Sequence, residues 1–336
     1  MIKCDVSGIS LSSPQIVPTR DGYGYGLIDA AKKNSKVVAI GADITASTRV
    51  DWFKKEFPQR FFNIGIAEQN QMGIAAGMSL MGKIPFVCNY GVFLAGRSWD
   101  QIRTTVCYNN LNVKLGGAHG GISVGPDGAT HQALEEIALM RCLPNMTVIV
   151  PTDAVETRKA TIAAADYPGP IYIRFGREGV PVVTNEDTPF EIGAANLLRE
   201  GTDIAIIACG AMVYEALLAA EELAKQGLQA MVINLHTIKP IDKDAIIEAA
   251  RLCGGVGNGS GHERGNGRGR GIITVEEHQV MGGMGSAVAE VVSQCCPVKM
   301  KLIGVNDRFG ESGDPATLMD QFGLTAKHIV SCALEM

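Results

Sequence analysis

Short apolar runs rich in β-branched residues alternate with stretches of helical period through almost the whole chain. We predict buried strands at residues 36–42, 61–66, 84–90, 112–117, 146–151 and 170–176, with helical stretches between most of them. A chain that goes from strand to helix and back to strand builds a parallel sheet covered by helices on both faces. The alternation therefore predicts an α/β fold.

A polar, turn-rich segment at residues 177–193 interrupts this rhythm. The alternation then resumes, with strands predicted at 203–210, 230–237, 272–278 and 298–305. A chain of 336 residues is long enough for two domains of roughly 150 residues each. We therefore expect two domains, residues 1–190 and 191–336, each a mostly parallel sheet with helices on both faces.

Residues 254–271 are foreign to the pattern, because glycine dominates them and three arginines are interleaved. Such a segment has too little apolar surface to order itself, which favours a flexible insertion before the next strand. The alternative is an arginine–glycine contact segment for RNA or a partner. The absence of aromatic residues for base stacking weakens the RNA version.

Composition excludes several classes of function. The net charge of −5 gives no electrostatic reason to expect nucleic acid or an anionic membrane as a partner. No apolar run approaches the ~20 residues that cross a bilayer, and the N-terminus lacks the pattern of a signal peptide. Nine scattered cysteines indicate a reduced cytoplasmic protein, and six histidines without ligand spacing argue against a metal site built by this chain.

Glu68 is an acid among apolar and small residues, in the segment "FFNIGIAEQNQMGIAAG" at 61–77. It falls where a predicted strand gives way to a helix, so the carboxylate suits the free N–H groups and the dipole of a helix start. No lysine or arginine is near it in the sequence. We therefore expect Glu68 either to keep a proton or to meet a bound partner.

A glycine-rich loop at residues 118–136 contains His119, Asp127 and His131. Thr130 or Asp127 could cap the following helix, which is the structural alternative. Two histidines and an aspartate on closely approachable backbone suit the binding of hydroxyls and a charged group at the carboxyl ends of parallel strands. The loop is not a phosphate-binding P-loop, because no Gly-Lys-Ser/Thr follows it.

Two further segments place aromatic or basic residues near predicted strand ends. Phe93 and Trp99 flank a strand-to-helix turn, where aromatic side chains serve either the core or a cofactor. Arg174 and Arg177 lie at the end of the strand at 170–176. They could bind phosphate at the rim of the sheet, or form a solvated or ion-paired loop.

Three blocks together resemble transketolase: "NIGIAEQNQMGIAAGMSLMG", "GISVGPDGATHQALEEIALMRCLPNMTVIVPTDAVE" and "TVEEHQVMGGMGSAVAE". The resemblance covers about residues 15–330 and is to the C-terminal half found in split, two-gene transketolases. It implies a pyrimidine-binding domain followed by the transketolase C-terminal domain. That family binds thiamine diphosphate between domains of different subunits, and its diphosphate domain uses a Gly-Asp-Gly motif. The "GPDG" at 125–128 belongs to another block, so the resemblance implies that an N-terminal partner subunit holds the diphosphate and its Mg²⁺ or Ca²⁺, in an α2β2 assembly.

The resemblance also implies roles for individual residues. Glu68 matches the glutamate that hydrogen-bonds N1′ of the aminopyrimidine, and His119 and His131 match the other catalytic positions. The implied cofactor-binding residues are Glu68, Phe93, Asp43 and Trp99. The implied substrate-binding residues are Arg20, Ser47, His119, Asp127, His131 and Arg174. Arg177 competes with Arg174, because "RFGREGVP" is longer than the usual family spacing.

The match to the family is not complete. Gly96 stands where a second ring-contacting aromatic is common, and Trp99 stands where tyrosine is common. Deoxyxylulose-phosphate synthase shares related blocks but carries arginine after the His119 position, where this chain has Gly120. The pyruvate dehydrogenase β subunit has the same layout without the Gly-x-Asp-Gly-x-Thr-His block. A non-catalytic regulatory paralogue is a further alternative, against which the intact acidic and histidine positions argue.

Overall fold

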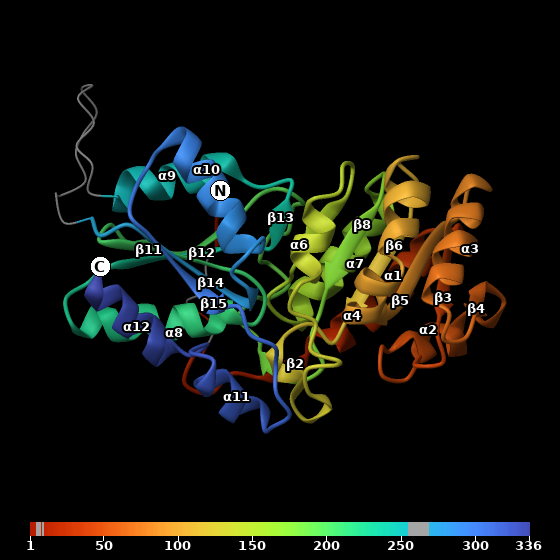
Figure 1. Ribbon diagram of the computed structural model, residues 1–336, viewed down its shortest axis with the longest axis horizontal. Coiled ribbons are helices and arrows are strands. Elements are labelled where there is room, and N and C mark those ends of the chain that lie inside the picture. The colour runs from red at the N-terminus through yellow and green to blue at the C-terminus, as the bar shows by residue number, and fades with distance from the viewer. Residues whose placement is uncertain (5–7, 9, 255–268) are drawn as a thin grey trace.

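The computed structural model describes residues 1–4, 8, 10–254 and 269–336. Two large sheets lie side by side with helices packed around them, and a two-stranded ribbon lies at their junction (Figure 1). The predicted glycine-rich insertion lies outside the described residues, apart from its ends. The predicted α/β architecture is confirmed by these two sheets.

The first sheet has seven strands in the spatial order β13-β7-β8-β6-β5-β3-β4. Six of them run parallel to their neighbours, and only β13 is antiparallel to β7. Its strands are β3 (Val37–Gly41), β4 (Phe61–Asn63), β5 (Ile84–Tyr90), β6 (Lys114–Ala118), β7 (Thr147–Ile149), β8 (Ile171–Arg174) and β13 (Thr237–Lys239). Strands β3, β5 and β6 are almost wholly buried, which is why β3 reads in the sequence as an unbroken apolar run and β5 is mainly apolar.

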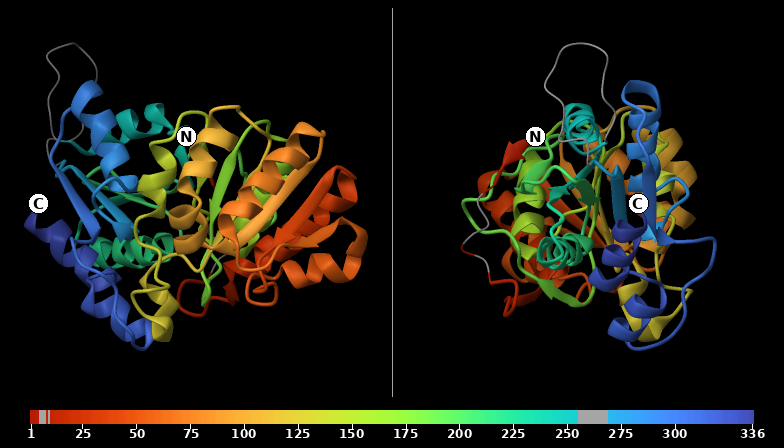
Figure 2. Two further views of the ribbon diagram at one scale, coloured as in Figure 1. Left: turned by 45° about the vertical axis from the view of Figure 1, so that its right-hand side comes forward. Right: turned by 90° about the vertical axis from the view of Figure 1, so that its left-hand side faces the viewer.

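Helices cover this sheet on both faces (Figures 1 and 2). They are α1 (Thr19–Lys33), α2 (Val50–Glu56), α3 (Glu68–Leu80), α4 (Gly91–Arg97), α5 (Trp99–Gln101), a π-helical turn η2 (Ile102–Cys107), α6 (Glu136–Arg141) and α7 (Ala154–Asp166), with short 3₁₀ turns η1 (Pro58–Arg60) and η3 (Ile122–Asp127). Helices α1 and α7 approach closely, since a Cβ at Gly22 would lie 2.0 Å from the Ala154 carbonyl oxygen. Asp153 begins α7 by accepting a hydrogen bond from the Glu156 amide.

The second sheet has the order β1-β10-β12-β11-β14-β15, and only β10 and β12 pair antiparallel. Its strands are β1 (Ile2–Lys3), β10 (Asn196–Arg199), β11 (Ile204–Ala208), β12 (Ala230–Asn234), β14 (Ile272–Gln279) and β15 (Met300–Val305). Its helices are α8 (Met212–Lys225), α9 (Lys243–Cys253), α10 (Met284–Cys295), α11 (Pro315–Gln321) and α12 (Ala326–Glu335). This half therefore repeats the layered plan of the first.

The two halves exchange strands at their boundary. Strand β1 at the N-terminus pairs with β10 of the second sheet, and β13 of the second half pairs with β7 of the first. The ribbon joins β2 (Ile16–Pro18) to β9 (Gly179–Pro181). One apolar core runs through both sheets, from Val87 and Leu115 to Ile233 and Ile272. The halves are thus packed as one body, which fixes loops of one half against strands of the other.

Candidate active site at the carboxyl edge of the first sheet

Most of the predicted site residues follow the carboxyl ends of neighbouring strands in the first sheet. Asp43 follows β3, Glu68 follows β4, Phe93 follows β5, His119 follows β6 and Arg177 follows β8. These strands are parallel, so their carboxyl ends meet at one edge of the sheet. The edge where a parallel α/β sheet ends in loops is the usual position of a ligand site.

Glu68 is the first residue of α3, and only 5% of its side chain is exposed. Its Oε1 accepts hydrogen bonds from Asn89 Nδ2 at 3.3 Å and from Arg97 Nη1 at 3.2 Å. Glu68 therefore has a basic neighbour in the folded chain, although no lysine or arginine lies near it in the sequence. Arg97 lies 29 residues further along the chain and comes close because α3 and α4 are adjacent at this edge.

The same arginine covers the Phe93 ring. The Arg97 guanidinium carbon lies 4.1 Å from the ring centroid, and the side chain is 52% exposed. His131 meets the ring of Phe93 edge-on, with centroids 5.3 Å apart. A buried carboxylate and an aromatic ring thus both contact one half-exposed cation. A carboxylate beside an aromatic face suits a flat, protonatable heterocycle.

Buried amide groups complete the back of the Glu68 pocket. Asn89 Nδ2 also donates to Gln71 Oε1 at 3.3 Å. Gln71 is fully buried, and its Nε2 has no hydrogen-bond partner among the residues that the structure describes. A buried donor without an acceptor is costly unless a ligand or water meets it, so this pocket has polar capacity that the described chain leaves unused.

His119 directly follows β6 and takes a left-handed backbone conformation, with φ of +59°. Its ring packs on Tyr90 with centroids 4.3 Å apart, and its Nδ1 is buried without a partner among the described residues. Burial, and then the nearby charges of Arg20 and Arg177, lower the pKa of His119 to about 3. The ring is therefore neutral at physiological pH, and it offers one donor and one acceptor.

Three arginines surround His119 and make this part of the edge cationic. Arg20 donates from Nη1 to the Ser47 carbonyl oxygen at 3.1 Å, while its buried Nε has no partner within the described residues. Burial and the neighbouring Arg49 lower the pKa of Arg20. Arg49 is held by Asp21 at 2.6 Å. Clustered guanidinium groups of this kind suit an anionic oxygen group.

Arg177 joins this cluster from the loop after β8. Its Nη1 lies 3.1 Å from Asp127 Oδ1 and donates to the Val124 carbonyl oxygen at 3.3 Å. Asp127 and Arg177 are both about one-third exposed, so a ligand can reach them and replace the ion pair between them. The structure therefore brings Asp127, Arg177, His119 and Arg20 to one region.

Arg174 lies elsewhere, and its contacts oppose the phosphate-binding role expected from the sequence. It is 6% exposed, and its Nε pairs with the buried Glu136 carboxylate. Its Nη2 donates to the carbonyl oxygens of Glu277 at 2.7 Å and Ala133 at 3.3 Å. Two of its three guanidinium nitrogens, Nε and Nη2, are therefore already committed to protein acceptors. The alternative of an ion-paired arginine therefore fits Arg174, and Arg177 is the better phosphate candidate.

Trp99 and Asp43 also have protein partners. The Trp99 indole Nε1 donates to the Leu139 carbonyl oxygen at 3.0 Å, and its ring packs against the apolar core. This geometry favours the core alternative for Trp99. Asp43 has a φ of +60° and accepts from Asn63 Nδ2 at 2.5 Å, while its own amide donates to Asn63 Oδ1. Asp43 remains at the edge of the sheet beside Gly65.

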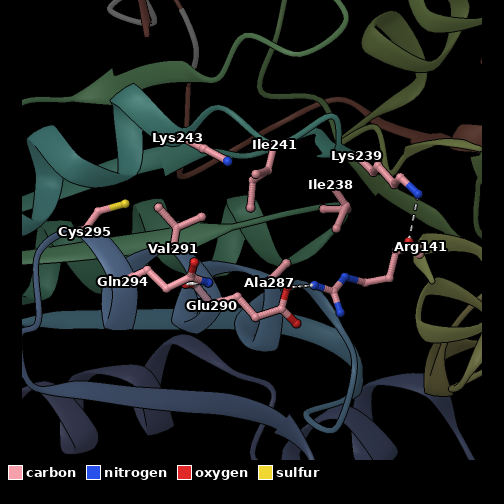
Figure 3. A pocket seen from close by; sticks show the side chains of 10 residues that line it. All are labelled: Arg141, Ile238, Lys239, Ile241, Lys243, Ala287, Glu290, Val291, Gln294 and Cys295. Carbon is pink, nitrogen blue, oxygen red and sulfur yellow. Dashed lines mark hydrogen bonds and ion pairs between the residues drawn. The ribbon is translucent and has the colours of Figure 1, made fainter. Parts of the chain in front are cut away.

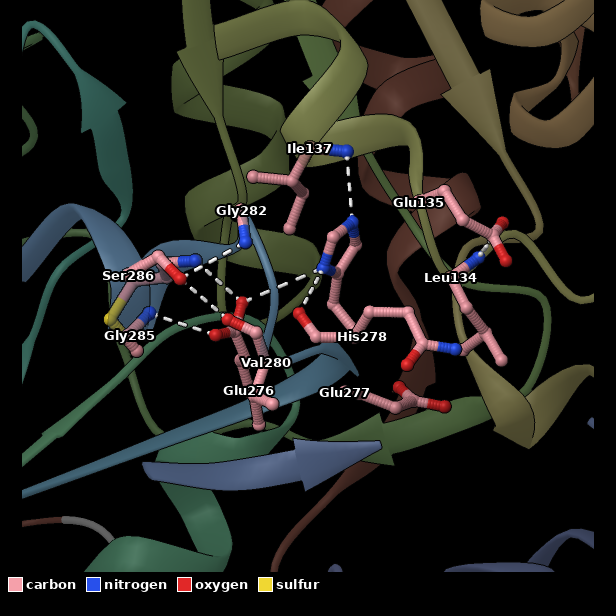
Figure 4. Close-up of polar contacts among 12 residues, drawn as sticks. Leu134, Glu135, Ile137, Glu276, Glu277, His278, Val280, Gly282, Gly285 and Ser286 are labelled. Carbon is pink, nitrogen blue, oxygen red and sulfur yellow. Dashed lines mark hydrogen bonds and ion pairs between the residues drawn. The ribbon is translucent and has the colours of Figure 1, made fainter. Parts of the chain in front are cut away.

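A buried charged cluster behind the edge was missed by reasoning from the sequence. Glu276, Glu277 and His278 lie together on β14 (Figure 4). His278 lies 4.0 Å from the Glu136 carboxylate, and the Glu277 carbonyl oxygen accepts from Arg174, so the cluster meets the first half. His278 Nε2 accepts from the Ile137 amide at 3.2 Å, and Nδ1 donates to the Gln279 carbonyl oxygen at 2.7 Å, so the ring is neutral. Burial raises the pKa of Glu276 to about 8. The only available signal was the run "EEH" at the end of an apolar strand.

A cavity of about 290 Å³ lies away from these residues, between β13, α9 and α10 (Figure 3). Two of its three cations are paired with protein acceptors. Arg141 pairs with Glu290 at 2.6 Å, and Lys239 donates to the carbonyl oxygens of Arg141 and Leu143. The third, Lys243, lies at the exposed start of α9, and the described lining residues include no buried side-chain atom that lacks a hydrogen-bond partner, unlike the carboxyl edge.

The sequence also led us to expect no metal site built by this chain and no membrane-spanning segment. Across the described residues, no group of three or more histidine, cysteine or acidic side chains has the arrangement of a metal site. No helix in that same part of the chain has both the length and the apolar character needed to cross a bilayer.

Comparison with known proteins matches two families to successive parts of the chain. The transketolase pyrimidine binding domain matches residues 15–182, and the transketolase C-terminal domain matches residues 193–255 and 266–329. A putative transketolase C-terminal section from Methanocaldococcus jannaschii is 42% identical over 94% of this chain and 95% of its own length.

The names of two other relatives specify a substrate. A 6-deoxy-6-sulfo-D-fructose transketolase subunit from Clostridium sp. is 42% identical over 94% of both chains. An apulose-4-phosphate transketolase subunit from Phocaeicola vulgatus is 38% identical over 95% of this chain and 97% of its own length.

Among solved structures, a split-gene transketolase described as an inactive beta4 tetramer superposes with a TM-score of 0.85. It is 46% identical and covers 95% of this chain and 98% of its own. These matches cover both sheets and the carboxyl edge between them. The chain therefore belongs to the transketolase family, and it corresponds to the pyrimidine-binding and C-terminal domains of a split-gene transketolase.

Proposed function

We propose that this chain is one subunit of a heteromeric transketolase that transfers a two-carbon ketol unit from a ketose phosphate to an aldose phosphate. Transketolases are transferases, and the chain's membership of this family implies that its activity depends on thiamine diphosphate. The observation that carries the proposal is Glu68, a buried carboxylate that begins a helix beside the Phe93 ring. The relatives that match over nearly their full length are named as subunits or as a C-terminal section.

The residues present fit the pyrimidine half of the cofactor. Glu68 supplies a carboxylate, Phe93 an aromatic face, and Gln71 and Asn89 buried amides, one with an unused donor. When bound, thiamine diphosphate supplies the carbon nucleophile and the electron sink of the reaction. Glu68 is placed to share a proton with a ring nitrogen of the aminopyrimidine, in a site where burial strengthens that hydrogen bond.

The diphosphate and its divalent metal ion need another binding site. The described residues contain no cluster of three or more histidine, cysteine or acidic side chains that could hold a metal ion. Beside Glu68, Arg97 is the cation within ion-pair distance among those residues. We propose that an N-terminal partner subunit holds the diphosphate and Mg²⁺ or Ca²⁺, in an α2β2 assembly. The nine free cysteines of the chain fit a reducing compartment, and we place the complex in the cytoplasm.

The substrate site extends from Phe93 toward His119 and the arginine cluster. We assign the phosphate to Arg20, Arg177 and the Ser47 turn, with Arg177 in place of Arg174. Neutral His119, His131 and Asp127 are placed to hydrogen-bond the distal hydroxyl oxygens of the sugar. A buried neutral imidazole can orient an oxygen without adding charge to an already cationic site.

A second candidate donor is a sugar with a sulfonate in place of the phosphate. The Clostridium relative acts on such a sugar according to its name. Guanidinium groups bind sulfonate and phosphate oxygens by the same forked hydrogen bonds, so the arginine cluster fits either anion. The distinction lies in net charge, since phosphate carries up to two negative charges and sulfonate one.

The direct test is reconstitution. The chain is co-expressed with the product of the neighbouring gene and assayed for ketol transfer with thiamine diphosphate and Mg²⁺, using phosphorylated and sulfonated ketose donors in parallel. We expect transfer only when both chains and the cofactor are present. Full activity from this chain alone, or no transfer by the assembled complex with any ketose donor, would contradict the proposal.

A further inference from the structure

The loop that carries His119 and Asp127 rests on a residue of the second sheet. Glu277, on β14, is 5% exposed, and its Oε1 accepts a hydrogen bond from the Ser123 amide at 2.6 Å. The two residues are 154 positions apart in the sequence. A charge-assisted hydrogen bond of this length is among the stronger kinds, and here it joins the loop of one half to a strand of the other.

The loop backbone lies so close to the side chains of Glu277 and Arg174 that only glycine fits at residues 120 and 121. A Cβ at Gly121 would lie 2.3 Å from the Glu277 carboxylate carbon, and Gly121 has a φ of +99°. A Cβ at Gly120 would lie 2.6 Å from Arg174 Nε. Because His119 directly precedes these two glycines, their contact with Arg174 and Glu277 determines the direction in which the His119 ring leaves the strand.

Arg174 links Glu136 to the backbone of Glu277. It pairs with Glu136 and donates to the Glu277 carbonyl oxygen at 2.7 Å. Figure 4 shows Glu277 beside the cluster of Glu276 and His278, with its carboxylate directed away from Glu276. Arg174 thus holds the backbone of Glu277, and the buried Glu277 carboxylate accepts its hydrogen bond from the Ser123 amide, so the strand and the loop are joined at this residue.

The far end of the loop is held from the same half of the molecule. Gln132 Nε2 donates to the carbonyl oxygens of Ile122 at 3.0 Å and Glu311 at 2.8 Å. A Cβ at Gly128, next to Asp127, would lie 2.3 Å from Ser312 Oγ. Glu311 and Ser312 precede α11, so both ends of the loop are supported by the second half of the chain.

We propose that Glu277 is a positioning residue of the transferase: its carboxylate holds the backbone of residues 120–123 and thereby fixes His119 and Asp127 for the distal part of the sugar. The inference rests on the proposed function for the identity of the substrate. It assigns a task to the C-terminal domain, which otherwise contributes no residue to the proposed site. Glu277 acts through the loop and touches neither substrate nor cofactor.

The test compares Glu277→Ala and Glu277→Gln in the reconstituted complex. Alanine removes the acceptor for the Ser123 amide, whereas glutamine keeps one oxygen at that place. We expect Glu277→Ala to raise the KM for a phosphorylated ketose about tenfold. Hydroxypyruvate has no distal hydroxyl groups or phosphate, so its KM should change less than twofold. Thiamine diphosphate affinity should not change, and Glu277→Gln should restore most of the KM.

A second measurement needs no turnover and separates this inference from the proposed function. Amide hydrogen exchange of the full chain should show faster exchange in residues 119–125 of Glu277→Ala, by about tenfold or more, with α7 unchanged. Glu276→Gln is the matched control, because Glu276 caps α10 through the Met284 and Gly285 amides and does not touch the loop. It should leave both the KM and the exchange of the loop unchanged.

Misfolding of one variant does not remove the test. Gly121→Ala approaches the same contact from the loop, and it should reproduce the selective rise in KM. The inference is overturned if Glu277→Ala raises KM equally for both donors, if loop exchange is unchanged, or if Glu276→Gln has the same effect as Glu277→Ala. Loss of all ketol transfer by the wild-type complex, together with faster loop exchange in Glu277→Ala, would refute the proposed function and keep the anchoring role.

Discussion

Removal of Arg97 should strengthen cofactor binding. The Arg97 guanidinium pairs with Glu68 at 3.2 Å and covers the Phe93 ring at 4.1 Å. These are the two groups that we assign to the pyrimidine, so a bound cofactor has to displace the guanidinium from both. Arg97→Ala removes this competition and leaves the carboxylate and the ring in place.

The size of the effect follows from the two contacts. Arg97 is 52% exposed, so solvent screens its ion pair, which is then worth up to about 1 kcal/mol. Stacking of a guanidinium on an aromatic ring at an exposed position adds about 0.5–1 kcal/mol. Together these contacts oppose binding by about 0.5–2 kcal/mol. Arg97→Ala should therefore lower the Kd of thiamine diphosphate by about 2- to 30-fold.

The assay is calorimetric titration of thiamine diphosphate and Mg²⁺ into the complex of this chain with its partner. Arg251→Ala is the control, because it removes the same charge from an exposed position on α9 of the second half. It should leave the Kd unchanged. A Kd that stays the same or rises in Arg97→Ala would show that the guanidinium belongs to the bound site, and would refute the displacement argument.

Four further outcomes follow from the charged groups. Arg177→Ala should raise the KM for a phosphorylated donor at least about tenfold, whereas Arg174→Ala should lower the free energy of unfolding by about 3–5 kcal/mol in denaturant titrations, because it leaves Glu136 buried and unpaired. Since burial raises the pKa of Glu276 to about 8, the folded chain keeps a proton that the unfolded chain releases, so stability should fall from pH 5 to 8 by about 1 kcal/mol per unit more in wild type than in Glu276→Gln. His119, with its pKa lowered to about 3, should show no NMR titration shift between pH 5 and 8.

The strands of the fold were predictable because they are buried on both faces. The run predicted at 84–90 coincides with β5, and the run predicted at 272–278 matches β14 to within one residue. The first consists mainly of apolar residues, and the second begins with the β-branched run Ile-Ile-Thr-Val, which are signals of an interior parallel strand. Strand pairing across the domain boundary gave no such signal. Strands β1 and β13 are two and three residues long, too short for any period.

Helix boundaries near the site were less predictable. The helical pattern starting at His131 predicts a helix from that residue, but α6 begins only at Glu136. Gln132 is responsible, because its side chain is committed to loop carbonyls at Ile122 and Gly125. Those tertiary hydrogen bonds hold residues 131–135 in a turn, so local propensity is overridden.

The sequence predicted which residues belong to the candidate site better than it predicted which of them contact one another. The position of Glu68 at a strand-to-helix junction could be read from the sequence, but its pairing with Arg97 depends on the packing of α3 and α4. Arg174 and Arg177 could not be told apart by pattern, because both lie near the end of one predicted strand. Arg174 is the last residue of β8 and faces the buried cluster, while Arg177 follows in the loop at the rim.

The role proposed for Glu68 at the bound pyrimidine can be measured in the assembled complex. Glu68→Ala, reconstituted with the partner, thiamine diphosphate and Mg²⁺, is assayed for ketol transfer beside Glu200→Ala, which removes an exposed carboxylate from the second sheet. We predict that Glu68→Ala loses transfer by at least about a hundredfold while the complex still assembles, and that Glu200→Ala is unaffected. Near-normal transfer by an assembled Glu68→Ala complex would contradict the account.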